Sequence, residues 1–436
     1  MNFFLSAICA AATVGSLFSA AAVQAQARVA LPSPARLLRL ETMADSAYQA
    51  KSYLFAAERY ELMGRYARFA TGRGTAHYNA ACCRALAGQT DLALRELETA
   101  VQAGYHNATQ MQADTDLASL HAAPRYQQVL RQLAAHPETM PTDPDKALLV
   151  TADIARFWRA YDHAQRQPDR AVAIYDQEYF DKGSVGLQDY YELKIKDTRL
   201  FVQNQEVKKA FYRSIRPNTL RVAAMTEQIR AGFRQMKQLY PAAEFPPVYF
   251  VVGRFNSGGT ASAHGMLIGT DQMSGTPDTP RGELSPWERN ALGSLDHLPE
   301  LVAHEQVHYI QKKGGPNTLL RGAIDEGMAD FLAELTTGRR PTAPHYHYGD
   351  AHEKQVWADF KKEMNGTNWN NWIANGLTQE NSDKPGDLGY YVGYCICQAY
   401  YEGQADKEQA VHDMLNISDY PAFLAASGYD ARLAAH

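Results

Sequence analysis

Two histidines in the sequence have the spacing of metal ligands. His304 and His308 lie four residues apart in LVAHEQVHYI, a segment that follows Pro299. Proline suits the first turn of a helix, and helical side chains at positions i and i+4 project from one face. Two imidazoles about one turn apart can bind one metal ion, and the pattern His-Glu-x-x-His favours zinc. Glu305 would then be placed to act as a general base towards a metal-bound water.

A second segment supplies the acidic groups that such a site still needs. Catalytic zinc usually has three protein ligands and a water molecule. Glu326 and Asp330 are also four residues apart, in a helical pattern over residues 321–335. We expect Glu326 to be the third ligand and Asp330 to accept the remaining N–H of a ligating histidine. The loop at Gly314–Pro316 is short enough for the two helices to pack antiparallel. The sequence therefore predicts one Zn²⁺ per chain.

Hydrolysis at such a centre would also require a donor that stabilises an oxyanion. Tyr390 and Tyr394 are the candidates, four residues apart in a glycine-containing segment, and the flanking residues favour Tyr394 slightly. Ordinary helix packing is the alternative for both tyrosines. A second histidine group is interpreted as part of a loop that rims the cleft rather than as another metal site; its members are His345, His347 and His352.

The elements that position these residues fall into two parts. Residues 36–136 are predicted to form paired helices with an internal repeat, in which Ala56 and Ala93 occupy matching positions. This pattern of small and large residues resembles the tetratricopeptide repeat, which implies a surface for a protein partner. The alternative is a rigid cap on the next domain. Proline-rich residues 137–147 are predicted to be a linker.

The second domain, residues 148–436, is predicted to be mainly α with a small β-sheet, an α+β fold. Apolar residues at steps of three or four predict a helix over residues 222–240. Residues 248–253 are expected to form a strand and residues 265–269 a returning strand. From Pro299 onward the pattern is helical, with loops expected around residues 314–316, 338–349 and 375–385.

The first 27 residues predict export. Residues 1–27 are apolar and rich in alanine and carry no charged side chain, which is typical of a signal peptide cleaved after Ala25 or Ala27. An uncleaved membrane anchor is the alternative, and Cys9 lacks the context of a lipid attachment site. No other stretch is long enough to span a bilayer. We therefore expect a periplasmic or secreted protein with no membrane span after cleavage.

Composition and cysteine usage exclude several classes of protein. The net charge of −5 argues against a nucleic-acid partner, because such proteins carry a basic surface. Four cysteines beyond the signal are too few for a disulfide framework and are expected to be buried apolar residues; they are Cys82, Cys83, Cys395 and Cys397. Motifs of serine hydrolases and of nucleotide-binding proteins are absent from the sequence.

The residues named above carry a family resemblance. The segments His304–His308 and Glu326–Asp330 resemble the gluzincin metallopeptidases, whose core is the thermolysin-like helix, loop and helix. More closely, residues 149–429 look like a family of bacterial proteins described as predicted zinc-dependent proteases of otherwise unknown function. The stretches that carry this likeness include DIARFWRAYD, YFDKGSVG and PGDLGYYVGYCICQAYY. The resemblance implies a metallopeptidase-like fold with a small sheet whose edge strand lines the cleft.

From these features the sequence predicts an exported zinc peptidase that hydrolyses a peptide or protein substrate. Zinc-bound water would be the nucleophile, with Glu305 as its base. One alternative is a binding or scaffold protein in which the repeats carry the function and the zinc site is structural or vestigial. Another is a zinc hydrolase with a non-peptide substrate. Retention of Glu305 favours an enzyme, because a purely structural zinc ion would not require it.

Overall fold

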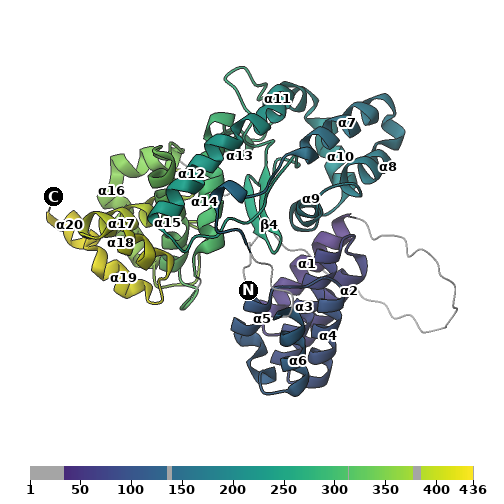
Figure 1. Cartoon of the computed structure of the whole chain (residues 1–436), viewed down its shortest axis with the longest axis horizontal. Coiled ribbons are helices and arrows are strands. Elements are labelled where there is room, and N and C mark those ends of the chain that lie inside the picture. The colour runs from purple at the N-terminus through teal and green to yellow at the C-terminus, as the bar shows by residue number, and fades with distance from the viewer. Residues whose placement is uncertain (1–33, 135–139, 313, 377–383, 436) are drawn as a thin grey trace. The chain divides into compact units, whose positions relative to one another are not determined.

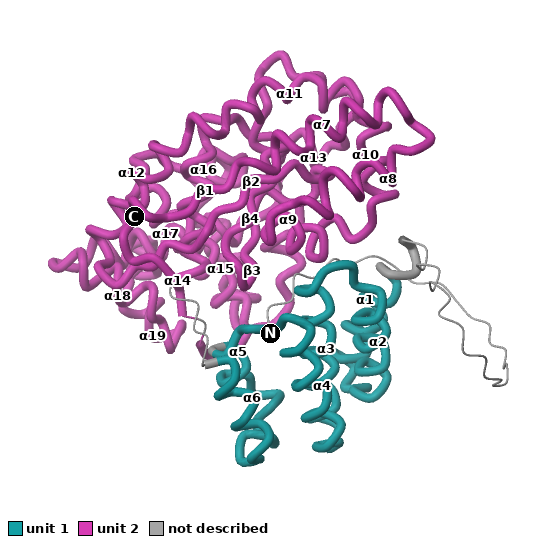
Figure 2. Tube along the Cα trace, turned by 45° about the vertical axis from the view of Figure 1, so that its right-hand side comes forward, with its two compact units in different colours: residues 1–137 teal, residues 138–436 magenta. Residues whose placement is uncertain are grey.

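The chain consists of two compact units. The structure, a computed structural model, describes residues 34–134, 140–312, 314–376 and 384–435 (Figure 1). Residues 1–137 form unit 1 and residues 138–436 form unit 2 (Figure 2). The predicted signal peptide and the first residues of the predicted linker lie outside the described residues. The prediction of a mainly helical chain with a small β-sheet is confirmed.

Unit 1 is built from successive helices joined by short loops, so that neighbours in the sequence pack against each other. Small residues allow this close approach: Ala56, Ala80 and Ala93 are fully buried. Tyr60 and Tyr78 fill the remaining space in the two apolar clusters of the unit. The elements are α1 (Pro34–Gln49), α2 (Tyr53–Tyr66), α3 (Ala70–Leu86), α4 (Thr90–Gln102), α5 (Ala108–Ala113), the 3₁₀ helix η1 (Thr115–Leu120) and α6 (Pro124–Ala134).

Unit 2 begins with a helical layer whose elements were not predicted from the sequence. Its core is aromatic, and Phe157 contacts Trp158, Tyr179 and Phe201. Two of its turns are π-helical, which interrupts the usual 3.6-residue period. The elements are η2 (Pro144–Lys146), α7 (Ala152–Arg166), η3 (Pro168–Arg170), α8 (Ala171–Tyr175), the π-helix η4 (Asp176–Phe180), α9 (Val185–Tyr190), the π-helix η5 (Tyr191–Ile195), α10 (Thr198–Val207) and α11 (Lys209–Arg221).

The predicted helix over residues 222–240 begins as a 3₁₀ turn. This turn is η6 (Val222–Met225), and α12 (Thr226–Leu239) continues from it. Ile229, Phe233 and Met236 are buried, as the periodicity predicted.

The sheet has four strands in the order β1-β2-β4-β3. These are β1 (Leu149–Val150), β2 (Val248–Val251), β3 (Gly259–Ser262) and β4 (Gly265–Gly269). Residues 248–251 and 265–269 are strands, as predicted, but residues 265–269 do not form a returning strand beside residues 248–251, because β4 runs parallel to β2. The residues between these two strands contain β3, which begins at Gly259 and pairs antiparallel with β4. β2 and β4 are buried along their whole length, which explains their continuous apolar sequences.

The remainder of unit 2 is helical. The elements are α13 (Pro286–Ala291), η7 (Leu295–His297), α14 (Leu298–Ile310), α15 (Leu319–Thr337), α16 (Pro344–Glu363), α17 (Leu388–Gly403), α18 (Lys407–Leu415), α19 (Tyr420–Ser427) and α20 (Tyr429–Ala435). The expected loop over residues 338–349 was too long, because α16 begins at Pro344, a residue suited to a first helical turn.

Helices α15 and α17 cross at glycines. A Cβ atom at Gly393 would collide with the carbonyl oxygen of Ala323, and one at Gly327 would collide with the backbone of Tyr394. The two backbones therefore lie in direct contact, which only glycine permits. This contact fixes the position of α15, the helix that carries Glu326 and Asp330.

Among the described residues, no helix is both long and apolar enough to cross a membrane. Cys82, Cys83, Cys395 and Cys397 are free and buried.

Candidate metal centre

Helix α14 presents its two histidines to one side while its other faces enter the core. Pro299 lies in the first turn, and Val302, Ala303 and Val307 are buried. The side chains of His304 and His308 are 12% and 16% exposed. Their ring centroids lie 4.6 Å apart. The backbone of the helix thus places both imidazoles together at an accessible edge of the core.

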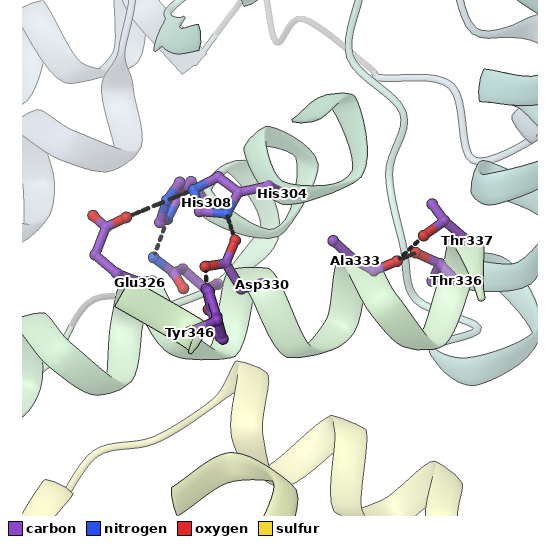
Figure 3. Close-up of polar contacts among 9 residues, drawn as sticks. His304, His308, Glu326, Asp330, Ala333, Thr336, Thr337 and Tyr346 are labelled. Atoms are coloured by element: carbon purple, nitrogen blue, oxygen red, sulfur yellow. Dashed lines mark hydrogen bonds and ion pairs between the residues drawn. The ribbon is translucent and has the colours of Figure 1, made fainter. Parts of the chain in front are cut away.

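Glu326 of α15 completes a group of three converging donors (Figure 3). The Nε2 atoms of His304 and His308 lie 2.9 Å apart, and Glu326 Oε2 lies 3.6 Å and 3.2 Å from them. A tetrahedral zinc ion with ligands at about 2.0 to 2.1 Å has ligand atoms roughly 3.3 Å apart. Two imidazole nitrogens and one carboxylate oxygen at these separations fit zinc in both chemistry and spacing.

A second group contacts each histidine on its other nitrogen. Asp330 Oδ1 lies 2.8 Å from His304 Nδ1, and the hydroxyl of Tyr346 donates to Asp330 Oδ2 (Figure 3). On the other ring, Gln311 Nε2 lies 2.9 Å from His308 Nδ1. Partners of this kind fix the tautomer and the ring orientation of a metal ligand.

The charges of the centre are strongly coupled. Burial disfavours the charged form of His304, but Asp330 and Glu326 outweigh it and raise the pKa of this imidazole well above its usual value. Burial likewise opposes ionisation of Glu326, but the two histidines outweigh it and hold the pKa of its carboxyl well below the usual value. The carboxylate is therefore available as a ligand.

The carboxylate of Glu305 lies against β3 of the sheet. Its side chain is buried, and a Cβ atom at Gly259 of β3 would collide with its carboxylate. Glycine at this position therefore makes room for Glu305 between α14 and the strand.

The structure separates the two candidate tyrosines. The ring of Tyr390 stacks 6.3 Å from that of His304, and the charge of Glu326 acts on its phenol. Burial raises the pKa of this phenol well above its usual value. Tyr394, which the sequence favoured slightly, instead donates to Glu334 at 2.6 Å and is not part of the centre.

The second histidine group was expected in a loop, but all three residues lie on α16. His345 comes closest to the centre, with its ring 5.8 Å from that of Tyr390. Burial lowers its pKa to about 4, so this imidazole is neutral. His352 lies at a kink in the helix and contacts the carbonyl of Tyr348.

One other group of described residues has metal-binding side chains close together, in unit 1: Cys82, Asp114 and Asp116. Hydrogen bonds among these residues and their neighbours explain why the three side chains lie close together. Asp114 caps η1 by accepting the N–H of Asp116, and it also accepts from Tyr78 and Cys82. Burial raises the pKa of the Cys82 thiol well above its usual value. The thiolate, the form that binds metals, is therefore disfavoured.

Two residues that contact the centre were not identified from the sequence. Tyr346 is on a separate helix, and no spacing connects it to Asp330. Gln311 follows the second histidine by three residues, so helical periodicity could have indicated it.

The fold is that of a mainly helical domain with a small sheet, in which three metal-binding side chains converge. A family model described as gliding motility protein GldB matches residues 140–431, nearly all of unit 2. The chain belongs to this family. The family is one of lipoproteins, which agrees with an exported protein associated with the cell envelope. No curated protein matches the chain, and no solved structure does either.

This membership corrects the functional prediction. The matching family is one of gliding motility proteins, and no protease family matches. The likeness to a family of zinc-dependent proteases and to gluzincins was therefore wrong, as was the prediction of a peptidase with a peptide substrate. The motif His-Glu-x-x-His places two imidazoles on one face of a helix. A metal site without enzymatic activity can have the same geometry, so the motif alone does not identify a peptidase.

Proposed function

We propose that this protein is an envelope-associated scaffold of a gliding motility complex, with one structural zinc ion bound by His304, His308 and Glu326. Membership of the gliding motility family supports a role among protein partners. The observation that carries the zinc proposal is the convergence of three donor atoms from two helices, within 3.6 Å of one another.

A zinc ion at this position would act as a cross-link inside unit 2. Helix α14 contacts β3 and β4, and α15 contacts α17. The bound ion would supply no reaction; it would tie the helix beside the sheet to the helix in the C-terminal layer. Without a metal ion, the two imidazoles and the carboxylate would be poor hydrogen-bond partners for one another at these distances. A bound ion would offset the cost of burying these polar atoms together.

Unit 1 supplies the partner surface in this proposal. Its successive helix pairs have the burial pattern of a tetratricopeptide-like array, with alanines at the close contacts. Several large apolar side chains of the unit are nevertheless exposed: Leu54 by 47%, Phe55 by 41% and Leu92 by 38%. Exposed apolar groups of this size are suited to contact with another protein.

The test compares Glu305→Gln with His304→Ala. Zinc content is measured on the purified proteins, and gliding is scored after each variant is returned to a strain that lacks the gene. Glu305→Gln is expected to retain one zinc per chain and to restore gliding fully, because a scaffold requires no general base. His304→Ala should lose the zinc and restore gliding poorly.

Failure of Glu305→Gln to restore gliding while it keeps its zinc would contradict a purely structural centre. Stoichiometric zinc in His304→Ala would remove this histidine from the ligand set.

A further inference from the structure

Gln311 is the first residue after α14, and its side chain ends against one of the predicted zinc ligands. Its backbone N–H donates to Val307 at the end of the helix, and the residue is buried. Its Nε2 atom lies 2.9 Å from His308 Nδ1. The following inference rests on the proposed zinc centre and assigns a role to this amide.

The orientation of the amide determines which nitrogen of His308 carries the proton. An NH₂ group can only donate, so Nε2 of Gln311 requires a lone pair on Nδ1 of His308. The imidazole proton is then on Nε2, which lies 3.2 Å from Glu326 Oε2. A metal ion needs a lone pair at this same Nε2. This tautomer therefore allows His308 to donate to Glu326, but it prevents Nε2 of His308 from binding a metal ion.

Nothing else in the described surroundings holds the amide in this orientation. Gln311 Oε1 is buried and has no hydrogen-bond partner among the described residues. A half-turn of the terminal amide exchanges its oxygen and nitrogen without moving any other atom, and such orientations are inferred from hydrogen bonds. After this half-turn, Oε1 faces Nδ1 and accepts a hydrogen bond from its N–H.

We propose that Gln311 is a positioning residue of the zinc centre. Its Oε1 accepts from Nδ1–H of His308 and so fixes the tautomer that presents Nε2 to the metal. Asp330 has the same relation to His304, at 2.8 Å. Each imidazole is thus held by an oxygen acceptor. For His304 the acceptor is the carboxylate of Asp330 on α15, and for His308 it is the amide of Gln311, directly after α14.

The test separates hydrogen-bond acceptance from packing. Zinc affinity is measured with a competing chelator on the whole protein and on Gln311→Glu and Gln311→Met. Glutamate is an acceptor only, so Gln311→Glu should bind zinc at least as tightly as the wild type. Gln311→Met keeps the length of the side chain but cannot accept strongly, and it should weaken binding by about 10-fold to 100-fold.

Two further variants calibrate this measurement. Asp330→Leu should weaken zinc binding by a similar ~10-fold to 100-fold, because it removes the corresponding acceptor for His304. Gln306→Met is the matched control: Gln306 is also a buried glutamine of α14, but it donates to the carbonyl of Glu244, away from the centre. Its zinc affinity should equal that of the wild type.

The outcomes distinguish the inference from the proposed function. Unchanged affinity in Gln311→Met, or equal weakening in Gln311→Glu and Gln311→Met, would overturn the role of Gln311 while leaving the zinc centre intact. Absence of zinc binding by the wild type would overturn both. If Gln311→Met fails to fold, the comparison of Gln311→Glu with the wild type still decides, because a weakened Gln311→Glu contradicts an acceptor role.

Discussion

The ligands of the proposed centre depend on their neighbours for their charge and orientation. Glu326 lies between two imidazoles and interacts electrostatically with the phenol of Tyr390. Asp330 contacts both His304 and Tyr346. Loss of a neighbour is therefore expected to alter metal affinity, even where the three donor atoms remain.

The two tyrosines of α17 offer a direct comparison. Tyr390→Phe removes the hydroxyl that interacts with Glu326 and should weaken zinc binding by on the order of 10-fold. Tyr394→Phe removes the hydrogen bond to Glu334, so it should lower the free energy of unfolding by about 1 to 3 kcal/mol and leave zinc affinity unchanged. Chelator competition and urea denaturation measure the two effects. Equal zinc affinity in both variants would contradict a role for Tyr390.

At this scale the sequence was informative where one helix determines the geometry. The spacing of His304 and His308, and that of Glu326 and Asp330, places each pair on one helix face whatever the tertiary fold. The choice between Tyr390 and Tyr394 depends on how α17 rotates against α15, and periodicity within one helix does not contain that information. Tyr346 lies on a third helix and could not be found in this way.

At the scale of elements, the glycine contact between α15 and α17 is the feature most sensitive to change. Gly393→Ala would push a methyl group into the carbonyl of Ala323, so it should lower the free energy of unfolding by about 1 to 3 kcal/mol or more. Zinc affinity should fall too, because α15 carries Glu326. Urea denaturation with and without zinc measures both effects.

Gly403→Ala is the matched control on the same helix. A Cβ atom at Gly403 meets no atom within 4 Å, so this variant should be as stable as the wild type or slightly more stable. If Gly393→Ala and Gly403→Ala are equally stable, α15 and α17 can move apart without a loss of unfolding free energy, which would contradict the importance of the glycine contact.

The loop after β2 depends on a buried carboxylate. Asp271 is fully buried and accepts the N–H groups of Gly253 and Phe255 at 3.0 Å and 2.7 Å. Burial raises the pKa of Asp271 from 3.8 to about 6, although these hydrogen bonds act in the opposite direction. Ionisation is therefore harder in the folded protein than in the unfolded chain.

This shift predicts a pH dependence of stability. Because the folded pKa lies above the unfolded value, the contribution of Asp271 is most favourable below pH 4 and declines as the pH rises towards 6 and above. The unfolding free energy of the wild type minus that of Asp271→Asn should fall by roughly 2 to 3 kcal/mol between pH 4 and pH 7.5. Urea denaturation at both pH values measures this difference, and the other titrating groups cancel. A difference that is constant with pH would refute the raised pKa.

Elements were predictable where a single period extends over a whole segment. The helices that begin at Leu298 and Leu319 and the strands at residues 248–251 and 265–269 have clear patterns. The layer from Ala152 to Arg221 has short helices with π-helical turns and a proline inside α11, so no period persists long enough to detect. The direction of β4 could not be predicted, because its register depends on the intervening strand β3.

For the whole molecule, the sequence indicated a site but not its use. A metal-binding geometry follows from local spacing, whereas a role in motility depends on partners that contact the surface of the protein. The proposed zinc ligands all belong to unit 2, which the gliding motility family covers, while unit 1 has apolar clusters of its own. Metal binding and the partner surface of unit 1 can therefore be tested separately.

Removal of zinc should reveal this separation in calorimetry. A ligand that binds only the folded state adds free energy that grows with its concentration, about 4.1 kcal/mol at 1,000 times its Kd. Because the ligands lie in unit 2, a chelator should lower the melting temperature of that unit, on the order of 10 °C, and leave the transition of unit 1 in place. His304→Ala should already melt at the lower temperature and should not respond to the chelator. A single transition that shifts as a whole would show that the two units unfold as one cooperative body, and the absence of any shift in the wild type would contradict a structural zinc ion.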